Sequence, residues 1–415
     1  MRAQRCKGTR DLLPDEMAAF RLIEGVFRGC CLQRGYEEVR TPTLEYLHLF
    51  TSTGTLTPSR LSKVYSFLDW DGWSGERVVL RPDGTIPIAR LYIDTMSERE
   101  VAKLFYVTNV FIFEETGKET REKWQCGVEL VGTGSTLADV ELIALAMTVL
   151  QKLGLQDIEL RLSHAGLIRA LLTRFGLSAE EQTRMFDRIL DGDGEALVKL
   201  KTENPELGKS LLPLLNLKGE SSGFLKNMRT MLNQSLPELE PQFNNFIEVA
   251  DLLESLGCRY QVDIASGRGF EYYTGVMFQL FAAEKQVGGG GRYDALLPLL
   301  GGKDTPASGF ALYLDVLMNL MKPAVCVPSA PSTVLIRVGT PNTTILKEAF
   351  GLVDCLHEAG YAAEIYLGGK EPAALRWRID VQDKTPAFSL TDVMARKKFK
   401  AQTKDEVATL LGKHK

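Results

Sequence analysis

Two polar residues around a predicted turn have the chemistry needed to hold a cationic group. Asp83 and Thr85 flank a glycine in Leu80–Arg90, which reads as a strand, a Pro-Asp-Gly turn and a helix that begins near Thr85. A carboxylate and a hydroxyl at such a turn suit an ammonium group. An ordinary helix cap explains the same two residues equally well.

A second polar pair, Gln125 and Glu129, lies in the apolar segment Trp124–Gly132, which is predicted to be a β-strand. Side chains alternate along a strand with a period of two, so these two share one face. A glutamate in an apolar strand is costly if it is buried without a partner. Glu129 is therefore expected either to face water or to meet a cationic ligand.

The third stretch, Ser266–Leu317, begins with an arginine and a tyrosine pair, Arg268, Tyr272 and Tyr273. An apolar strand follows, then the four glycines Gly288–Gly291 and Arg-Tyr-Asp. Taken alone, the glycines favour a loop with positive φ angles. Neither nucleotide-binding glycine motif is present, because no Lys-Ser/Thr follows and no G-x-G-x-x-G opens a helix. The stretch ends in Gly309–Leu317, a predicted strand that passes into a helix.

The composition is that of a globular protein with more than one domain. The 415 residues, 45% hydrophobic and 25% charged, suit two or three domains. The formal net charge of −4 argues mildly against binding a whole tRNA, because phosphate contacts require a basic surface. The seven cysteines include no C-x-x-C pair and no histidine at ligand spacing, so no zinc site is expected. No cofactor is expected either.

The apolar segments and the linker composition predict the cellular location and the domain boundaries. No signal peptide and no run of about 18 apolar residues is found, so we expect no membrane span and a cytoplasmic location. A Pro- and Ala-rich linker, 322–332, separates a core at 1–322 from a last domain at 333–415. The basic run Ala395–Lys400 is either a solvated face or a contact for RNA phosphates.

Apolar periodicity predicts the elements that position these residues. The expected helices and strands are a helix capped by Asp15 and ended by Gly35, a strand at Tyr36–Pro42, a strand at Leu104–Glu114, a helix at Ser135–Leu153, a strand at Ile158–Leu162, helices through 165–257, and in the last domain Val334–Val338 (strand), Asn342–Ala359 (helix), Ala362–Tyr366 (strand) and a short strand at Pro386–Phe388.

The order of the motifs closely resembles the histidyl-tRNA synthetase family and its paralogues, the regulatory subunits of ATP phosphoribosyltransferase. Arg-Gly-x-(acid)-Tyr-Tyr-Thr-Gly, a strand, Gly-Gly-Gly-Arg-Tyr-Asp and Gly-Phe-Ala follow one another, and Gly35–Glu45 resembles the first class II motif. The resemblance implies an α+β fold. It would comprise a class II synthetase-like antiparallel sheet flanked by helices, a helical insertion at about 165–257 and a degenerate anticodon-binding-like α/β domain.

The same resemblance implies a pocket for free histidine. The positions that match the family's histidine-binding residues are Asp83, Thr85, Gln125, Glu129, Arg268, Tyr272 and Tyr273. Two carboxylates, an amide, a guanidinium and aromatic walls form a chemically consistent site for an amino acid with a basic side chain.

The ATP half of the family's site departs from the pattern at two positions. Class II synthetases carry arginines in Phe-Arg-x-Glu and Gly-Leu-Glu-Arg-Leu strings, but Ile112 and Val316 stand there in this chain. Losing one such charge-stabilising donor costs about 10²–10³ in rate. No catalytic residue is therefore expected.

The combination resembles a non-catalytic regulatory subunit of ATP phosphoribosyltransferase, which is required for the first step of histidine biosynthesis and for its feedback regulation by histidine. The implied partners are the short-form catalytic subunit, a second copy of the chain through the class II core, and histidine as effector. Two alternatives stay open: a divergent histidyl-tRNA synthetase that charges tRNA, and a non-enzymatic histidine- or RNA-binding paralogue.

Overall fold

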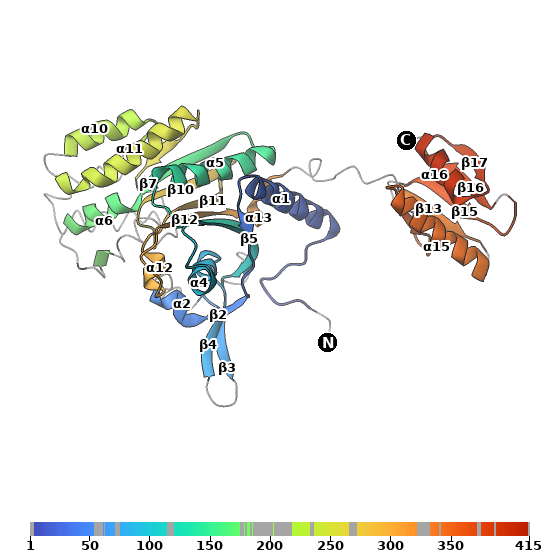
Figure 1. The fold of residues 1–415 in the computed structure, drawn as a ribbon, viewed down its shortest axis with the longest axis horizontal. Helices are drawn as coiled ribbons and strands as arrows, with labels where there is room; N and C mark the ends of the chain where they lie inside the picture. Colours follow the sequence, from blue (N-terminus) through green and yellow to red (C-terminus); the bar gives the residue numbers. More distant parts are fainter. Residues whose placement is uncertain are drawn as a thin grey trace. The chain divides into compact units, whose positions relative to one another are not determined.

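The computed structural model describes residues 4–53, 61, 63–70, 75–113, 120–174, 178, 181–182, 185, 202, 218–232, 236–264, 272–321, 333–339, 342–371, 375–385 and 387–413. The chain forms two compact units, Met1–Cys326 and Val327–Lys415, drawn in Figure 1. Both mix helices and strands, and the expected α+β class is confirmed.

A nine-stranded sheet forms the centre of the first unit, in the order β1-β5-β6-β12-β11-β10-β7-β9-β8. The six strands from β5 to β7 pair antiparallel, whereas β1 and β9 join their neighbours β5 and β7 in parallel. The strands are β1 (Glu37–Glu38), β5 (Ala102–Phe111), β6 (Glu122–Val131), β7 (Ile158–His164), β8 (Lys218–Gly219), β9 (Gln261–Asp263), β10 (Val276–Ala282), β11 (Lys285–Arg292) and β12 (Ala307–Tyr313).

Helices pack on this sheet through apolar faces. In α1, Phe20, Ile23 and Phe27 recur at helical spacing and are buried, as the periodicity predicts. The helix α5 contacts β12, and α13 contacts β6. The helices of this unit are α1 (Pro14–Gln33), α2 (Leu47–Ser52), α4 (Thr85–Thr95), α5 (Thr136–Lys152), α6 (Ala165–Arg174), α10 (Ser222–Leu232), α11 (Glu240–Ser255), α12 (Leu296–Leu299) and α13 (Leu314–Leu320), with a 3-10 turn η1 (Pro237–Leu239).

The expected insertion at 165–257 contains α6, α10 and α11, and Figure 1 shows α10 beside α11. Residues 186–201 and 203–217 of that insertion, and the expected linker at 322–332, lie outside the described residues. No helix in the described ranges is both long and apolar enough to cross a bilayer.

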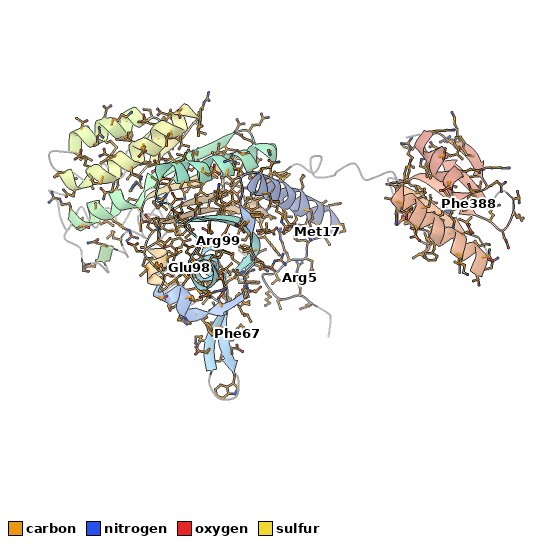
Figure 2. All side chains as sticks on the ribbon, in the orientation of Figure 1. Arg5, Met17, Phe67, Glu98, Arg99 and Phe388 are labelled. Carbon is orange, nitrogen blue, oxygen red and sulfur yellow. The ribbon has the colours of Figure 1, made fainter. Side chains whose placement is uncertain are left out.

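A small three-stranded sheet, ordered β2-β4-β3, leads to the first polar turn. Its strands are β2 (Leu44–Tyr46), β3 (Ser66–Trp70) and β4 (Gly75–Leu80). Phe67 lies on the β3–β4 hairpin (Figure 2) and is 47% exposed. Because β4 runs directly into the turn before α4, this sheet sets the place of Asp83.

Two sequence predictions about the first helix and the strand after it are wrong. Asp15 does not cap α1: the helix begins at Pro14, Leu13 is the N-cap, and Glu16 accepts a hydrogen bond from the Leu13 amide at 3.0 Å. A proline at the first helical position fixes this start. The strand expected at Tyr36–Pro42 shrinks to β1, Glu37–Glu38, because only two residues pair with β5.

The four glycines form no loop but half of the central strand β11, and none has a positive φ. Glycine is required there by close approach rather than by φ. A Cβ atom at Gly288 would lie 2.6 Å from the Ala311 carbonyl oxygen, and one at Gly290 would lie 2.1 Å from that of Gly309.

The second unit carries a five-stranded sheet, ordered β14-β13-β15-β16-β17, with α15 and α16 packed on one another. Phe388 (Figure 2) belongs to its core and starts a strand that is longer than the predicted Pro386–Phe388. The basic run continues into the edge strand β17. The elements are β13 (Thr333–Val338), α15 (Thr343–Glu358), β14 (Ala362–Ile365), β15 (Leu375–Val381), β16 (Phe388–Asp392), β17 (Lys397–Ala401) and α16 (Lys404–Lys413).

One buried ion pair fastens α5 to the end of β11. The Arg292 guanidinium donates to both carboxylate oxygens of Asp139, at 2.7 and 3.2 Å, and the two side chains are 6% and 5% exposed. Arg292 also donates to the Thr133 and Ser135 carbonyl oxygens, at 3.1 and 3.2 Å. The start of α5 is therefore held at the strand end that precedes Tyr293.

Substituting Arg292→Ala leaves the Asp139 carboxylate buried without its cation. We expect the free energy of unfolding to fall by about 3–5 kcal/mol, measured by urea denaturation. The matched control is Lys226→Ala, which breaks a 2.8 Å pair with Asp251 whose side chains are 46% and 45% exposed. That control should cost no more than about 1 kcal/mol. Equal losses in the two variants would contradict a fastening role for Arg292.

Candidate functional site

Six of the seven predicted site residues come together on one face of the central sheet, beneath the start of α4. Glu129 and Gln125 come from β6, Asp83 and Thr85 from the β4–α4 turn, and Tyr272 and Tyr273 from the segment before β10. Hydrogen bonds and electrostatic interactions link five of them, all except Gln125. Gln125 lies beside the turn, since a Cβ atom at Gly84 would lie 2.3 Å from its Nε2. The seventh residue, Arg268, lies outside the described residues.

Glu129 is the most deeply buried member of this cluster, at 1% exposure. Its Oε1 accepts a hydrogen bond from the Tyr106 hydroxyl at 3.1 Å, and its Oε2 accepts one from the Tyr293 hydroxyl. Burial raises the pKa of Glu129 to about 8, although hydrogen bonds from Tyr293 and Thr85 oppose this rise. Glu129 does not face water, because it is buried among hydroxyl donors, and the alternative of a cationic ligand stays a prediction.

Of the two roles that the sequence left open for Asp83, the structure shows the hydrogen bond to the start of α4, and the ammonium contact stays a prediction. Its Oδ1 accepts a hydrogen bond from the Ile86 amide at 2.9 Å and so caps the first turn of α4. Burial raises its pKa, while hydrogen bonds from the Ile86 and Thr85 amides and from the Tyr272 hydroxyl act against that rise. The carboxylate thus both ends the turn and faces the tyrosines.

Three tyrosine rings form an aromatic wall next to these carboxylates. The ring centroids of Tyr272 and Tyr273 are 5.1 Å apart, and Tyr293 lies 5.6 Å from Tyr272 and 6.0 Å from Tyr273. Burial raises the pKa of all three hydroxyls, and the neighbouring carboxylates add to the effect. These hydroxyls therefore stay neutral and act as hydrogen-bond donors.

Glycines make room for the polar side chains. A Cβ atom at Gly309, which pairs with Glu129 across β12 and β6, would lie 2.0 Å from Glu129 Oε2. One at Gly127 would lie 2.1 Å from Cζ of Tyr106, its partner on β5. Any larger residue at either position would displace the carboxylate or the ring.

Sequence reasoning missed two of the residues that touch Glu129, namely Tyr106 and Tyr293. Tyr293 carries a weak signal, because it stands in the Arg-Tyr-Asp string directly after the glycines. Tyr106 gives none within its own strand, because its role depends on facing Gly127 across the β5–β6 pair. The roles of both tyrosines depend on which residues face each other across neighbouring strands, and a single sequence does not reveal that register.

Two arginines lie near the positions where the family resemblance expects cations. The Ile112 amide donates to the Arg121 carbonyl oxygen at 2.9 Å, and the Arg121 guanidinium lies 4.1 Å from the Phe113 ring centroid. Beside Val316, Asp315 accepts a hydrogen bond from the Trp124 amide at 2.6 Å and forms an ion pair with Arg10. Both guanidinium groups are thus engaged with protein groups.

The acidic side chains of the cluster that the structure describes are Asp83 and Glu129. The charged group that most affects the pKa of Glu129 is Asp83, a second carboxylate. Within the described ranges, no lysine, arginine or histidine forms a salt bridge with either of them. Such an arrangement attracts a cation and repels an anion.

The raised pKa of Glu129 makes the unliganded protein less stable as pH rises, because the folded state keeps a proton that the unfolded state releases above pH 4.5. Burial lowers the pKa of His164 to about 4, so this residue makes the protein more stable as pH rises. That gain ends near pH 6.5, the ordinary pKa of histidine, above which both states are neutral at this residue. Between pH 6.5 and 8 the free energy of unfolding should therefore fall by about 1–2 kcal/mol. Thermal or urea unfolding across this window measures the slope. Glu129→Gln should flatten it, whereas Glu98→Gln, at an exposed surface position (Figure 2), should leave it unchanged.

Comparison with known proteins places the chain in a family. A family model described as histidyl-tRNA synthetase matches residues 8–317. The chain is 51% identical over 407 residues to the ATP phosphoribosyltransferase regulatory subunit of Dehalococcoides mccartyi, covering 98% of each chain. It is 34% identical over 380 residues to a histidine–tRNA ligase of Archaeoglobus fulgidus, covering 89% of this chain and 87% of the relative.

Two solved structures share the fold. An ATP phosphoribosyltransferase regulatory subunit/histidyl-tRNA synthetase from Bacillus halodurans aligns with a TM-score of 0.74 at 24% identity, covering 89% of this chain and 94% of that one. A histidyl-tRNA synthetase from Nostoc aligns with a TM-score of 0.75 at 19% identity over 100% of both chains. These confirm the class II synthetase-like architecture, while the closer sequence relatives carry the family assignment. The chain belongs to the histidyl-tRNA synthetase family and, within it, to the ATP phosphoribosyltransferase regulatory subunits.

Proposed function

We propose that this chain is a non-catalytic regulatory subunit of ATP phosphoribosyltransferase that binds free histidine in the cluster around Glu129. It would support the short-form catalytic subunit in the first step of histidine biosynthesis and transmit feedback inhibition by histidine. The observation that carries the binding proposal is a pair of buried carboxyl groups, Asp83 and Glu129. Both lie close to tyrosine side chains, and glycine leaves the space that the Glu129 carboxyl group occupies.

The cluster suits the groups that histidine offers. Asp83, at the start of α4, is an acceptor for the α-ammonium group, with the Thr85 hydroxyl beside it. Glu129 is the acceptor for a ring N–H group, and Tyr272 and Tyr273 provide aromatic walls. Arg268, which resembles the family's arginine for the substrate carboxylate, lies outside the described residues and completes the proposed set by resemblance.

The absence of catalysis is supported by Ile112 and Val316. Activation of an amino acid develops charge on the α-phosphate of ATP, and fixed cations there are often the largest single catalytic contribution. Hydrocarbon side chains cannot supply that charge at any pH. Arg10 and Arg121 lie nearby, but their contacts with Asp315 and Phe113 already occupy them.

A regulatory role requires a partner whose contacts change when histidine binds. Thermodynamic linkage makes the coupling reciprocal, so the catalytic subunit must also change the affinity of this chain for histidine. The name of the 51% identical relative supports the catalytic subunit of ATP phosphoribosyltransferase as that partner, and its short form is proposed from the family resemblance. A homodimer through the class II core is proposed from the family resemblance of Gly35–Glu45, and tRNA is not proposed as a ligand.

The runner-up is a divergent histidyl-tRNA synthetase, which the 34% identical ligase of Archaeoglobus fulgidus favours. A synthetase needs the same histidine pocket, so the Glu129 cluster fits both functions. The distinction rests on the nucleotide half of the site.

Histidine binding is tested by isothermal titration with the purified chain. Glu129→Ala and Arg268→Ala should each abolish measurable binding, because each removes a charged partner of the ligand. Asp83→Asn should weaken binding roughly tenfold or more, since a hydrogen bond to a charged group contributes about 1.5–3 kcal/mol. Glu98→Gln is the control with unchanged affinity. Unaltered affinity in both the Glu129 and the Arg268 variants would remove those residues from the site.

Regulation and catalysis are separated by two assays on the same preparation. Adding the chain to the short-form catalytic subunit should raise phosphoribosyltransferase activity, and histidine should then inhibit the complex. Histidine-dependent ATP–pyrophosphate exchange by the chain alone should stay at background. Exchange above background would favour the synthetase, and the lack of any complex with the catalytic subunit would favour a histidine-binding paralogue with another partner.

A further inference from the structure

In the described part of the second unit, the sheet ends in two edge strands that differ in their protection. The strand order places β14 at one end and β17 at the other. The strand β17 carries Lys397, Lys398 and Lys400, and lysines on an edge strand oppose pairing with another chain. The sequence of β14 is Ala-Ala-Glu-Ile, without a lysine or a proline. Of the two edges, β14 is therefore the one that is open to a further strand.

The register of β14 shows which of its backbone groups point away from the sheet. The Tyr366 amide donates to the Ile336 carbonyl oxygen of β13 at 2.8 Å. Backbone groups alternate in direction along a strand, so Ala363 and Ile365 direct their N–H and C=O groups to the free edge. The Nε2 atom of His357 donates to the Ala363 carbonyl oxygen at 2.9 Å, on that same edge. Both N–H groups and the Ile365 carbonyl group have no hydrogen bond with a described residue and can pair with an added strand.

An apolar stripe of α15 borders this free edge. Its members recur at i, i+4, i+7 and i+11 and so share one side of the helix; they are Leu346, Phe350, Val353 and His357. Because His357 contacts β14, this side of the helix runs along the strand edge. The other side of α15 contacts α16, where Glu348 pairs with Lys404 at 3.3 Å. The side chains of Leu346 and Phe350 are 39% and 58% exposed, so the α15 stripe offers apolar surface beside free backbone groups.

The opposite face of β14 carries one exposed acid, Glu364. Leu335, its partner in register on β13, stands outside the core that α15 covers, so both side chains lie on the face away from the helix. Arg337, on that face too, pairs with Glu371, and no described cation forms an ion pair with Glu364. A basic residue directly opposite Glu364 on an added strand is favourable, and an acidic one is unfavourable. Two copies of β14 paired with one another would bring two copies of Glu364 together, which disfavours a second copy as the occupant.

We propose that the free edge of β14, together with the α15 stripe, binds an extended segment of a partner protein as an additional strand. The segment alternates apolar residues, which pack against the α15 stripe, with basic residues, which lie on the face of Glu364. In such strand addition the main-chain hydrogen bonds supply affinity and the alternate side chains supply specificity. The surface lies within the second unit, so the proposal does not depend on histidine binding.

The test measures the binding of a fluorescein-labelled peptide, Lys-Val-Lys-Val-Lys-Val-Lys, to the full chain by fluorescence anisotropy. The unaltered chain should bind this peptide. The same peptide with every internal amide N-methylated keeps the side chains and the charge but lacks the N–H groups. Its affinity should be lower by about tenfold or more, because several main-chain hydrogen bonds are lost.

Ala363→Pro tests the strand edge itself. Proline removes the N–H group at the free edge and fills its place, while the neighbouring residues keep their hydrogen bonds to β13. Affinity for the lysine–valine peptide should fall by about tenfold or more. Ala363→Ser keeps the N–H group and should stay within about twofold of the unaltered chain. Thermal unfolding of both variants verifies that the second unit is folded.

Two further substitutions at exposed positions test the side-chain contacts. Phe350→Ala should weaken binding by about tenfold, since it removes apolar area that the peptide covers. Met394→Ala, which removes an 80% exposed apolar side chain between β16 and β17, is the matched control with unchanged affinity. Glu364→Lys should weaken binding of the lysine–valine peptide by about two- to fivefold and strengthen binding of the peptide with glutamate in place of lysine.

Three results would overturn the proposal. Equal binding of the N-methylated and unmodified peptides, or unchanged affinity in Ala363→Pro, would mean that charge alone holds the peptide and that no strand is added. If the peptide does not bind and sedimentation velocity shows an association between chains that Ala363→Pro abolishes, the edge pairs with a second copy instead of a partner segment. If neither binding nor such an association is found, the edge of β14 is not a docking site.

Discussion

The described site depends on accommodating one carboxyl group, that of Glu129, away from water. Glu129 is almost fully buried, and a buried carboxylate is tolerated only when its oxygens are hydrogen-bonded. Two tyrosines from neighbouring strands meet that demand, and a glycine opposite Glu129 leaves the space that the carboxylate needs. Register, residue size and protonation are thus linked at one position of the sheet.

The end of β11 connects this requirement to the stability of the whole core. Arg292 holds Asp139 at the start of α5, while the next residue, Tyr293, donates to Glu129. One residue fastens the helix, and its neighbour orients the buried acid. The ion pair that holds the start of α5 and the hydrogen bond to Glu129 are thus made by two consecutive residues at the end of β11.

The sequence revealed the parts of this arrangement that depend on local pattern. Period-two alternation placed Gln125 and Glu129 on one face, and turn chemistry placed Asp83 before α4. It failed where the meaning of a residue lies on a neighbouring strand. Gly288 and Gly290 are glycine because carbonyl oxygens of β12 approach them, which is why a loop was predicted wrongly. Tyr106 could not be singled out because its partner, Gly127, is identified only by register.

Charge decides what such a site is able to do. A cluster with two carboxylates and neutral hydroxyls attracts a cationic amino acid, whereas a triphosphate needs the opposite sign of charge nearby. Two described guanidinium groups beside Ile112 and Val316, those of Arg121 and Arg10, contact the Phe113 ring and Asp315. Recruiting either to a nucleotide would mean breaking an existing contact, and Arg10 would leave Asp315 behind as a further negative charge. The arrangement that supports the proposal of histidine binding thus also supports the proposal that histidine is not consumed, and a ligand that is bound but not consumed is what equilibrium regulation of a partner requires.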